Sequence, residues 1–130
     1  SPLNVALGKV SKTTFTGAGS TSTLTKFDIQ LKDCPETVTS AAINFGGTPD
    51  ADNNTTLALT PGATTATGVA IQLVDSSDQP VSLYTPSKQY PLAAGTTVNH
   101  LEFGARYIQT QESITAGQAN SASTFTVIYN

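Results

Sequence analysis

Cysteine, histidine and charged residues are scarce in this sequence: its 130 residues include one Cys, one His and only 12% Asp, Glu, Lys and Arg. Cys34 cannot form a disulfide within the chain, and one thiol without Cys or several His neighbours does not make a zinc site. A nucleophilic triad or general base would have to use His100, which is predicted to lie on the outer, solvated face of a strand. No local signature pairs it with Cys34. We therefore predict that the chain is not an enzyme and needs no metal or cofactor.

A basic surface and a long apolar run are also missing. The chain has six Lys and Arg against nine Asp and Glu, for a net charge of -3, and no basic cluster is interleaved with aromatics. This composition argues against nucleic acid as a partner. No apolar run approaches the roughly 18 residues that a membrane helix requires, and the first residues lack the charged-then-apolar order of a signal peptide. The sequence indicates a mature, soluble product.

What the sequence does contain is a recurring alternation of apolar and polar residues, separated by clusters of Gly, Pro, Asp, Asn and Ser. Successive side chains point to opposite faces of a β-strand, so this pattern predicts half-buried strands. The runs lie at residues 5–7, 24–31, 41–45, 57–59, 69–73, 80–83, 101–107 and 121–129. Seven or eight short strands in a chain of this size predict one immunoglobulin-like sandwich over residues 1–130.

One loop imitates a metal site. Asp50, Asp52 and Asn54 match the first three ligand positions of a calcium loop. Such a loop requires Gly at its sixth position and Glu at its twelfth, where this chain has Thr55 and Pro61. We therefore interpret the segment as a solvated turn.

Several stretches, taken together, resemble the type 1 and P pilus subunit family of chaperone–usher fimbriae. They span most of the chain and comprise residues 5–10, 27–34, 57–59 with 66–75, and 103–107. The C-terminal run resembles the family most specifically. Tyr129 is penultimate and Gly117 is fourteenth from the end, with alternating apolar residues between them, as in family members that chaperones recognise.

The resemblance implies an all-β fold: an incomplete immunoglobulin-like β-sandwich, the pilin fold, which lacks its final strand and is completed by a donor strand. A hydrophobic groove would stay open along the last strand of the chain, and an open groove is an aggregation hazard. In that family a periplasmic chaperone lends a strand to the groove, and the N-terminal extension of the next subunit later replaces it. The outer-membrane usher is the third expected partner. The product would be a fimbrium on the bacterial cell surface, assembled via the periplasm.

The resemblance also implies which residues form the groove and meet the chaperone and the neighbouring subunits. We predict that Phe125, Val127 and Tyr129 line it, that Leu101 and Phe103 form a deeper floor, and that Gly117 lets backbones approach or turn. A second interpretation stays open, in which the last-strand residues are simply the core of an ordinary final strand. One set of residues can serve both purposes.

The single cysteine has two interpretations. The residues alone leave Cys34 as a buried free thiol. The resemblance implies a disulfide cysteine whose partner is missing from this chain, which suits the oxidising periplasm. In the family, the partner lies on a first strand that follows a donor extension. We expect both to be absent from the 130 residues, so that another chain or peptide compensates.

We therefore predict a structural subunit of a chaperone–usher fimbria, which polymerises by donor-strand complementation and exchange to build the shaft used in bacterial adhesion. Contact with a host receptor would then be indirect, through the fibre. The alternative is a minor or tip subunit, or the pilin domain of an adhesin, that binds a host receptor directly. Exposed aromatic residues would favour the alternative, and Tyr84 and Tyr90 are the candidates.

Overall fold

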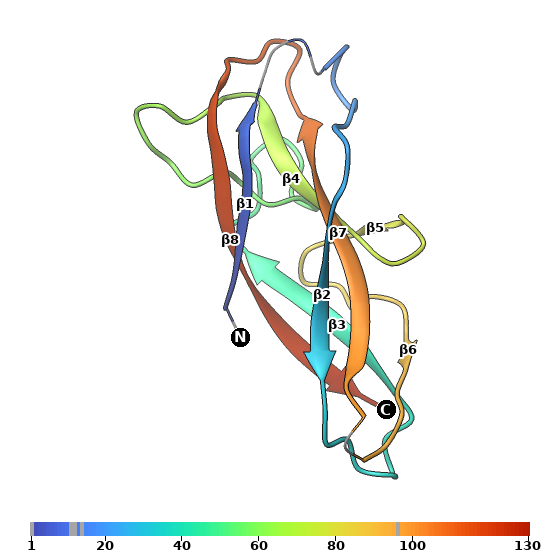
Figure 1. Ribbon diagram of the computed structural model, residues 1–130. Coiled ribbons are helices and arrows are strands. Elements are labelled where there is room, and N and C mark those ends of the chain that lie inside the picture. Colours follow the sequence, from blue (N-terminus) through green and yellow to red (C-terminus); the bar gives the residue numbers. More distant parts are fainter. Residues whose placement is uncertain (1, 11–12, 14, 96) are drawn as a thin grey trace.

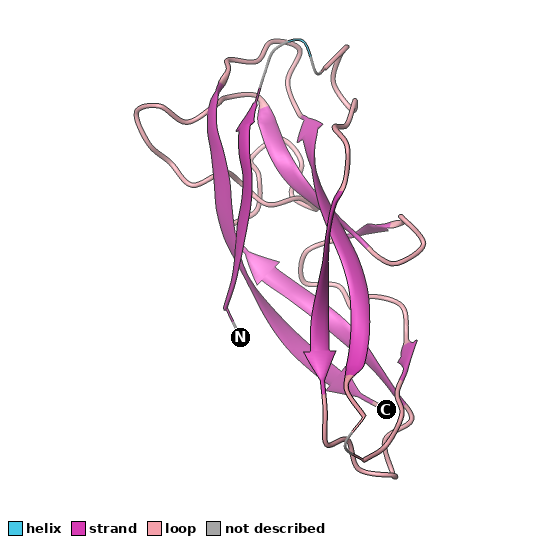
Figure 2. Cartoon of the chain, in the orientation of Figure 1, coloured by secondary structure: helices cyan, strands magenta, loops and turns pink. Residues whose placement is uncertain are grey.

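The computed structural model describes residues 2–10, 13, 15–95 and 97–130, which form two β-sheets packed against each other (Figure 1). The first sheet has the order β1 (Pro2–Val10), β8 (Gly117–Tyr129), β3 (Ser40–Gly47) and β6 (Tyr90–Pro91). The second has the order β2 (Thr25–Leu31), β7 (Asn99–Gln109), β4 (Val69–Val74) and β5 (Pro80–Val81). All paired strands within the two sheets are antiparallel. Figure 2 shows strands joined by loops, so the predicted all-β sandwich is confirmed.

The core lies between the sheets and is centred on aromatic rings. Phe45 of β3 and Phe103 of β7 are almost fully buried, and their ring centroids lie 5.1 Å apart in an edge-to-face arrangement. Tyr90 and Phe27 add two further rings, 5.1 Å and 6.0 Å from Phe103. Burying a Phe side chain stabilises a fold by about 1.5–3 kcal/mol, and each such ring pair adds roughly 0.5–1.5 kcal/mol. These rings therefore hold the two sheets together.

Most predicted strands are confirmed, with two differences. Residues 57–59 do not form a strand: Leu57 makes an isolated antiparallel bridge with Ile71, through N–H···O bonds of 2.8 and 2.9 Å. After β5 the chain leaves the sheet, because the Leu83 amide donates to the Thr55 carbonyl oxygen at 3.1 Å. Leu57 and Leu83 are buried nevertheless. The alternation predicted burial correctly at both places and overstated the length of the strands.

The segment that imitates a calcium loop is a turn closed by its own hydrogen bonds. Asp50 Oδ2 accepts the backbone N–H of Asp52 at 3.0 Å and that of Asn53 at 3.1 Å. Asp52 Oδ2 accepts a bond from Gln111 Nε2 at 2.8 Å. Both carboxylates therefore serve the turn and its neighbour, as Asp side chains in turns commonly do.

The last strand, β8, has different neighbours along its length. Residues 117–124 pair with β1, and residues 123–129 pair with β3 on the other side. Figure 1 shows β1 (dark blue) beginning midway along β8 (red) and running beside one half of it, while β8 continues to the C-terminus. Beyond Thr124 no described residue of β1 pairs with β8. Among the described residues, the C-terminal end of β8 therefore has a neighbouring strand on its β3 side alone.

Within the described ranges, no helix has the length and apolarity that crossing a membrane would require.

Candidate functional site

The open side of β8 exposes backbone groups of Val127 and Tyr129. In an antiparallel pair, residues that exchange two hydrogen bonds alternate with residues whose backbone groups point the other way. Asn130 and Ser40 exchange both bonds, at 2.9 and 3.2 Å. By alternation, the backbone groups of residues 126 and 128 also point toward β3, and those of residues 127 and 129 point away from it.

The hydrogen bonds on the far side of β3 independently give the same alternation of backbone directions. The carbonyl oxygens of Ile43 and Phe45 accept the amides of Ser87 (2.8 Å) and Tyr84 (2.7 Å), away from β8. Ile43 is opposite Val127 in the register, so Val127 likewise directs its N–H and C=O away from β3. Among the residues that the structure describes, none bonds these groups. We call residues 127–129 the free edge of β8.

A free edge of this kind is a template for another strand. Unpaired N–H and C=O groups at a sheet edge are the groups that an incoming β-strand satisfies. Proteins commonly protect such edges with charged residues or proline, but β8 contains neither. The edge is therefore chemically suited to pair with one more strand.

The inward face of β8 is less well covered beyond the residues that pair with β1. Along the half that β1 covers, the inward side chains are buried: Ala119, Ser121 and Ser123 are at most 8% exposed. Past that point Phe125 and Val127 are only half-buried, and Tyr129 is 49% exposed. The predicted groove-lining residues are thus the inward residues of β8 that the fold leaves incompletely covered. Their role in binding a strand stays a prediction.

Phe27 is a further residue of this region that the sequence alone did not assign to the groove. It lies on β2, an edge strand of the second sheet, and is half-buried although its neighbour Ile29 is buried. Its ring contacts that of Phe45 across the sandwich, with centroids 6.3 Å apart. Its place on the inward face of its strand was readable from the alternation. Its position at the sheet edge depends on pairing across the whole chain.

The two predicted floor residues lie in the centre of the core. Leu101 and Phe103 of β7 are 1% and 2% exposed, and Leu101 is opposite Ile29 in the β2–β7 register. Phe103 stacks on Phe27 and meets Phe45 edge-on. The structure therefore links Phe103 to the incompletely covered region through Phe27, whereas Leu101 packs deeper.

Gly117 lies at the opposite end of β8 from the free edge. A Cβ atom there would lie 2.3 Å from the Thr64 carbonyl oxygen and 2.8 Å from the Ala66 nitrogen. Next to it, the Gln118 amide donates to the Thr64 carbonyl and the Gln118 carbonyl accepts the Ala66 amide, both at 2.8 Å. Gly117 therefore permits two backbone segments to approach, and it does not contribute to the free edge.

Cys34 follows β2 and is 4% exposed. Its carbonyl oxygen accepts the Gly95 amide at 3.0 Å, and its sulfur lies 3.7 Å from Asn99 Nδ2. The thiol is free in this chain, which has one cysteine. The disulfide that the resemblance implies therefore stays a prediction.

His100 lies on the outer face of the β2–β7 pair, as predicted. Its Nδ1 contacts Asp28 Oδ2, and the two side chains are 54% and 37% exposed. Together with Lys26, Phe27 and Glu102 they border a shallow hollow of about 270 Å³. An exposed side-chain contact of this kind contributes little to stability. No group of three or more potential metal ligands gathers in the described part of the chain.

The two aromatic candidates for direct receptor binding differ sharply in exposure. Tyr90 is only 7% exposed, so the interpretation that it is available on the surface was wrong. Its hydroxyl donates to the Glu102 carbonyl oxygen at 2.7 Å, and burial raises its pKa. Tyr90 lies in β6, an edge strand of the first sheet, and packs on Phe103. Tyr84 is 64% exposed.

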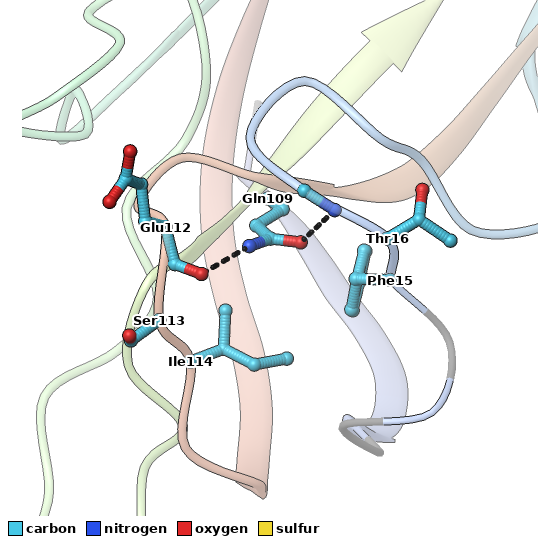
Figure 3. A pocket seen from close by; sticks show the side chains of 7 residues that line it. Phe15, Thr16, Gln109, Glu112, Ser113 and Ile114 are labelled. Atoms are coloured by element: carbon cyan, nitrogen blue, oxygen red, sulfur yellow. Dashed lines mark hydrogen bonds between the residues drawn. The ribbon is translucent and has the colours of Figure 1, made fainter.

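A separate hollow of about 370 Å³ lies between the segments 15–17 and 109–114. Figure 3 shows Gln109 at its centre, between the two segments. Gln109 Oε1 accepts the Gly17 amide at 3.1 Å, and its Nε2 donates to the carbonyl oxygens of Gln111 (2.7 Å) and Glu112 (3.1 Å). The buried amide is therefore fully used in holding the two loops together. This hollow is a structural junction.

Comparison with known proteins connects this geometry to a family. A family model described as fimbrial protein matches residues 1–130. The fimbrial subunit type 1 of Salmonella typhimurium is 38% identical over 130 residues, which cover 96% of this chain and 69% of the relative. The uncharacterized fimbrial-like protein SfmA of Escherichia coli K12 is 40% identical over 133 residues, covering 96% and 71%.

Solved structures agree with the sequence relatives. The Burkholderia pseudomallei antigen and type I fimbria protein BPSL1626 superposes with a TM-score of 0.84 at 34% identity, covering 99% of this chain and 97% of that one. The CupB6 tip adhesin from Pseudomonas aeruginosa gives 0.70 at 27% identity, covering 91% of this chain and 33% of its own. A structure of a chaperone–usher pilus concerned with rod uncoiling gives 0.66 at 19% identity, covering 86% and 72%, a likeness of fold.

Proposed function

The chain belongs to the fimbrial protein family, and on that premise we propose that it is a structural subunit whose free edge of β8 accepts a β-strand from a neighbouring subunit. It is a fimbrial subunit of the chaperone–usher type with an immunoglobulin-like all-β fold, as the resemblance predicted. The family is structural, and the chain is not an enzyme. Fimbrial proteins form surface fimbriae. Polymerisation by strand exchange, with this subunit in the shaft, is the proposal.

One observation carries the proposal: the inward side chains of β8 change from buried to incompletely covered where the backbone edge becomes free. One added β-strand with alternating apolar residues would both pair with the free backbone groups and cover the side chains. Its backbone would pair with residues 127 and 129, and its apolar side chains would cover Phe125 and Val127. A loop or a helix could cover the side chains but would leave the edge groups unpaired.

The proposed order of assembly follows from the tendency of an exposed strand edge to associate non-specifically. A subunit that leaves this edge open would associate non-specifically, so a strand must cover it from the time of folding. We propose that a periplasmic chaperone supplies the first strand and that the outer-membrane usher is where a neighbouring subunit's extension replaces it. The finished fibre at the cell surface would then contact a host only through its assembled surface.

The test uses thermal unfolding of the chain with a synthetic peptide of alternating apolar residues. Binding to the folded state alone at about 100 times Kd stabilises it by about 2.7 kcal/mol, which corresponds to a rise in Tm of roughly 10 °C for a domain of this size. A peptide shifted by one residue would turn its apolar side chains to solvent and should give a much smaller rise.

Two substitutions in β8 test whether the rise in Tm comes from binding at the free edge. Val127→Asp places a charge on the inward face beside the free edge and should abolish the rise. Thr126→Asp, the matched control, places the same charge on the exposed outward face one residue away and should preserve it. If the peptide leaves Tm unchanged in a monomeric, cooperatively folded chain, the sandwich is already complete and the subunit is a self-contained binding module.

A second candidate function is that of a minor or tip subunit that binds a receptor directly. The likeness to a tip adhesin at 27% identity and the exposed ring of Tyr84 favour it. The two functions predict different positions of the subunit in the fibre.

A further inference from the structure

Tyr84 is held in an unusual conformation that presents its ring to solvent. Its φ is 60°, in the left-handed region that bulky side chains rarely adopt. Its hydroxyl donates to the Gly47 carbonyl oxygen at 2.7 Å and accepts the Gly47 amide at 3.1 Å. The side chain is nevertheless 64% exposed. Backbone strain of this kind persists only where the surroundings hold it in place, and here two bonds to one glycine do so.

The ring lies over a glycine. A Cβ atom at Gly46 would be 3.1 Å from Cε1 and 3.6 Å from Cζ of the Tyr84 ring. One side of the ring is therefore against the Gly46 backbone, and a side chain at that position would lift it away. The Tyr84 hydroxyl is already bonded to Gly47. The part of the side chain that faces solvent is therefore the apolar face of the ring.

Neutral hydrogen-bonding side chains share the face on which the ring lies. In the β3–β8 register Gly46 is opposite Thr124 and Asn44 is opposite Thr126, and residues two apart share a face. The Thr124 hydroxyl would lie 2.9 Å from a Cβ atom at Gly46, so it is close to the ring. No described residue hydrogen-bonds the side chains of Asn44, Thr124 and Thr126, which keep their donors and acceptors available.

The absence of charge narrows the choice of ligand. Neither β3 nor β8 contains Asp, Glu, Lys or Arg. Lys88, on the chain segment that follows Tyr84, is directed elsewhere: its Nζ donates to Ser77 Oγ at 2.9 Å and lies 5.4 Å from the centre of the Tyr90 ring. An anionic or cationic ligand would therefore find no opposite charge on these strands.

We propose that Tyr84, with Asn44, Thr124 and Thr126, forms a binding platform for a neutral saccharide. A pyranose has an apolar C–H face that stacks on an aromatic ring and hydroxyls at its rim that bond neutral amides and alcohols. The platform matches both features, with a fixed ring and, on the same face, one amide and two hydroxyls. It lies on the outward face of β3 and β8, whereas the proposed strand exchange uses the backbone edge. Either proposal can fail without the other.

The test is an NMR titration of the isotope-labelled chain with methyl β-D-glucopyranoside, whose equatorial substituents leave a wide C–H face. We expect saturable shifts at residues 44, 46, 84, 124 and 126, and no comparable shifts with glycerol at the same concentration. Tyr84→Gly removes the ring and relieves the backbone strain together, so it should fold. It should weaken the affinity at least about tenfold, since ring stacking of about 1.4 kcal/mol corresponds to that factor.

A matched control makes the same backbone change elsewhere. Asp78 has a φ of 59° in a distant turn, and Asp78→Gly should leave the affinity unchanged. The proposal is overturned if no saturable shifts occur at these residues, or if the affinity survives Tyr84→Gly. It is also overturned if these residues shift with protein concentration alone and Tyr84→Gly abolishes that dependence, because the face would then contact a second copy of the chain.

Discussion

The Tyr107 hydroxyl links the two sheets at an irregular point of the β1–β8 pair. It donates to the Ala119 carbonyl oxygen of β8 at 3.0 Å. The register between β1 and β8 shifts between Ala6 and Lys9, next to Ala119, so the ladder is interrupted there. Burial raises the pKa of Tyr107 to about 12. The fold therefore depends on a neutral phenol at this position.

The pH dependence follows from that shift. The pKa of Tyr107 is about 12 in the folded chain, whereas in the unfolded chain the pKa has its ordinary value of 10.0. The stabilising contribution is thus fully present below pH 10 and is lost as the pH rises from about 10 to 12. Tyr107→Phe should lower stability at pH 7 by about 1 kcal/mol, since one hydrogen bond is lost.

Denaturant titrations at pH 7 and between pH 10 and 12 check this prediction. Between pH 10 and 12, Tyr107→Phe should lose less of its free energy of unfolding than the parent chain does. Tyr129→Phe, which alters an exposed phenol, serves as the control and should follow the parent at every pH. Equal alkaline losses in the parent chain and Tyr107→Phe would contradict the assignment.

Gly117 provides a second prediction at the scale of one residue. Gly117→Ala would push the new methyl group into the backbone of Thr64 and Ala66, which cannot rotate away as a side chain can. We expect a loss of roughly 1–3 kcal/mol, the usual cost of overpacking. Gly62→Ala is the control, because its Cβ would meet only the Thr65 hydroxyl. Similar denaturation midpoints for the two variants would show that the close approach is unimportant.

At the scale of the element, β8 should show alternating amide protection. The amides of residues 126 and 128 face β3 and should exchange slowly with solvent, and those of residues 121 and 123 face β1 and should also be protected. The amides of residues 127 and 129 lie on the free edge and should exchange faster by about 100-fold or more, the difference between an exposed and a bonded position.

Native-state hydrogen exchange, resolved by residue, measures the alternation directly. A bound donor peptide should slow amide exchange at residues 127 and 129 and leave the exchange rates of residues 126 and 128 unchanged. Uniform protection of residues 126–129 in the free chain would mean that the edge is already covered, and the strand-acceptor proposal would then lose its structural basis.

The strands show how far the sequence alone specifies the fold and the site. The alternation in β7 placed Leu101, Phe103 and Tyr107 inward, and the structure buries all three. Local alternation reports which face of a strand is apolar. It carries no information on which part of β8 pairs with β1, because that register joins residues more than 100 positions apart in the chain. The family resemblance supplied the idea of an open groove, and the pairing restricts it to the end of β8.

Tyr84 and Tyr90 illustrate the same limit for surface residues. Each has a proline nearby in the sequence, and both were expected to be exposed. Tyr90 is buried because its strand pairs with β3, through the Ala41–Tyr90 pair, and its ring reaches Phe103. The φ of 60° at Tyr84 and its bonds to Gly47 arise from contact with β3, which no pattern around residue 84 encodes.

At the scale of the whole molecule, charge is distributed unequally between the strand pairs β3–β8 and β2–β7. β8 and β3 have none, whereas β2 and β7 present Lys26, Asp28, Glu102 and Arg106 on their outer faces. The β2–β7 pair keeps its surface polar, and the uncharged strands β3 and β8 contain both the free edge and the Tyr84 face. Contacts with other molecules are therefore expected on the β3–β8 side, whether the partner is a strand or a saccharide.

The position of the subunit in the fibre decides between the shaft and the tip. A subunit that accepts a strand and passes one on can repeat indefinitely, so immunogold particles directed at the 75–79 turn should decorate fimbriae along their whole length. This turn is a suitable epitope because Ser76, Ser77 and Asp78 are exposed and lie on the second sheet, away from the free edge. A Val127→Asp subunit should abolish labelled fibres, and a Thr126→Asp subunit should preserve them. Labelling confined to fibre ends would contradict a shaft role and would establish the tip position, where the Tyr84 face would be presented once per fibre.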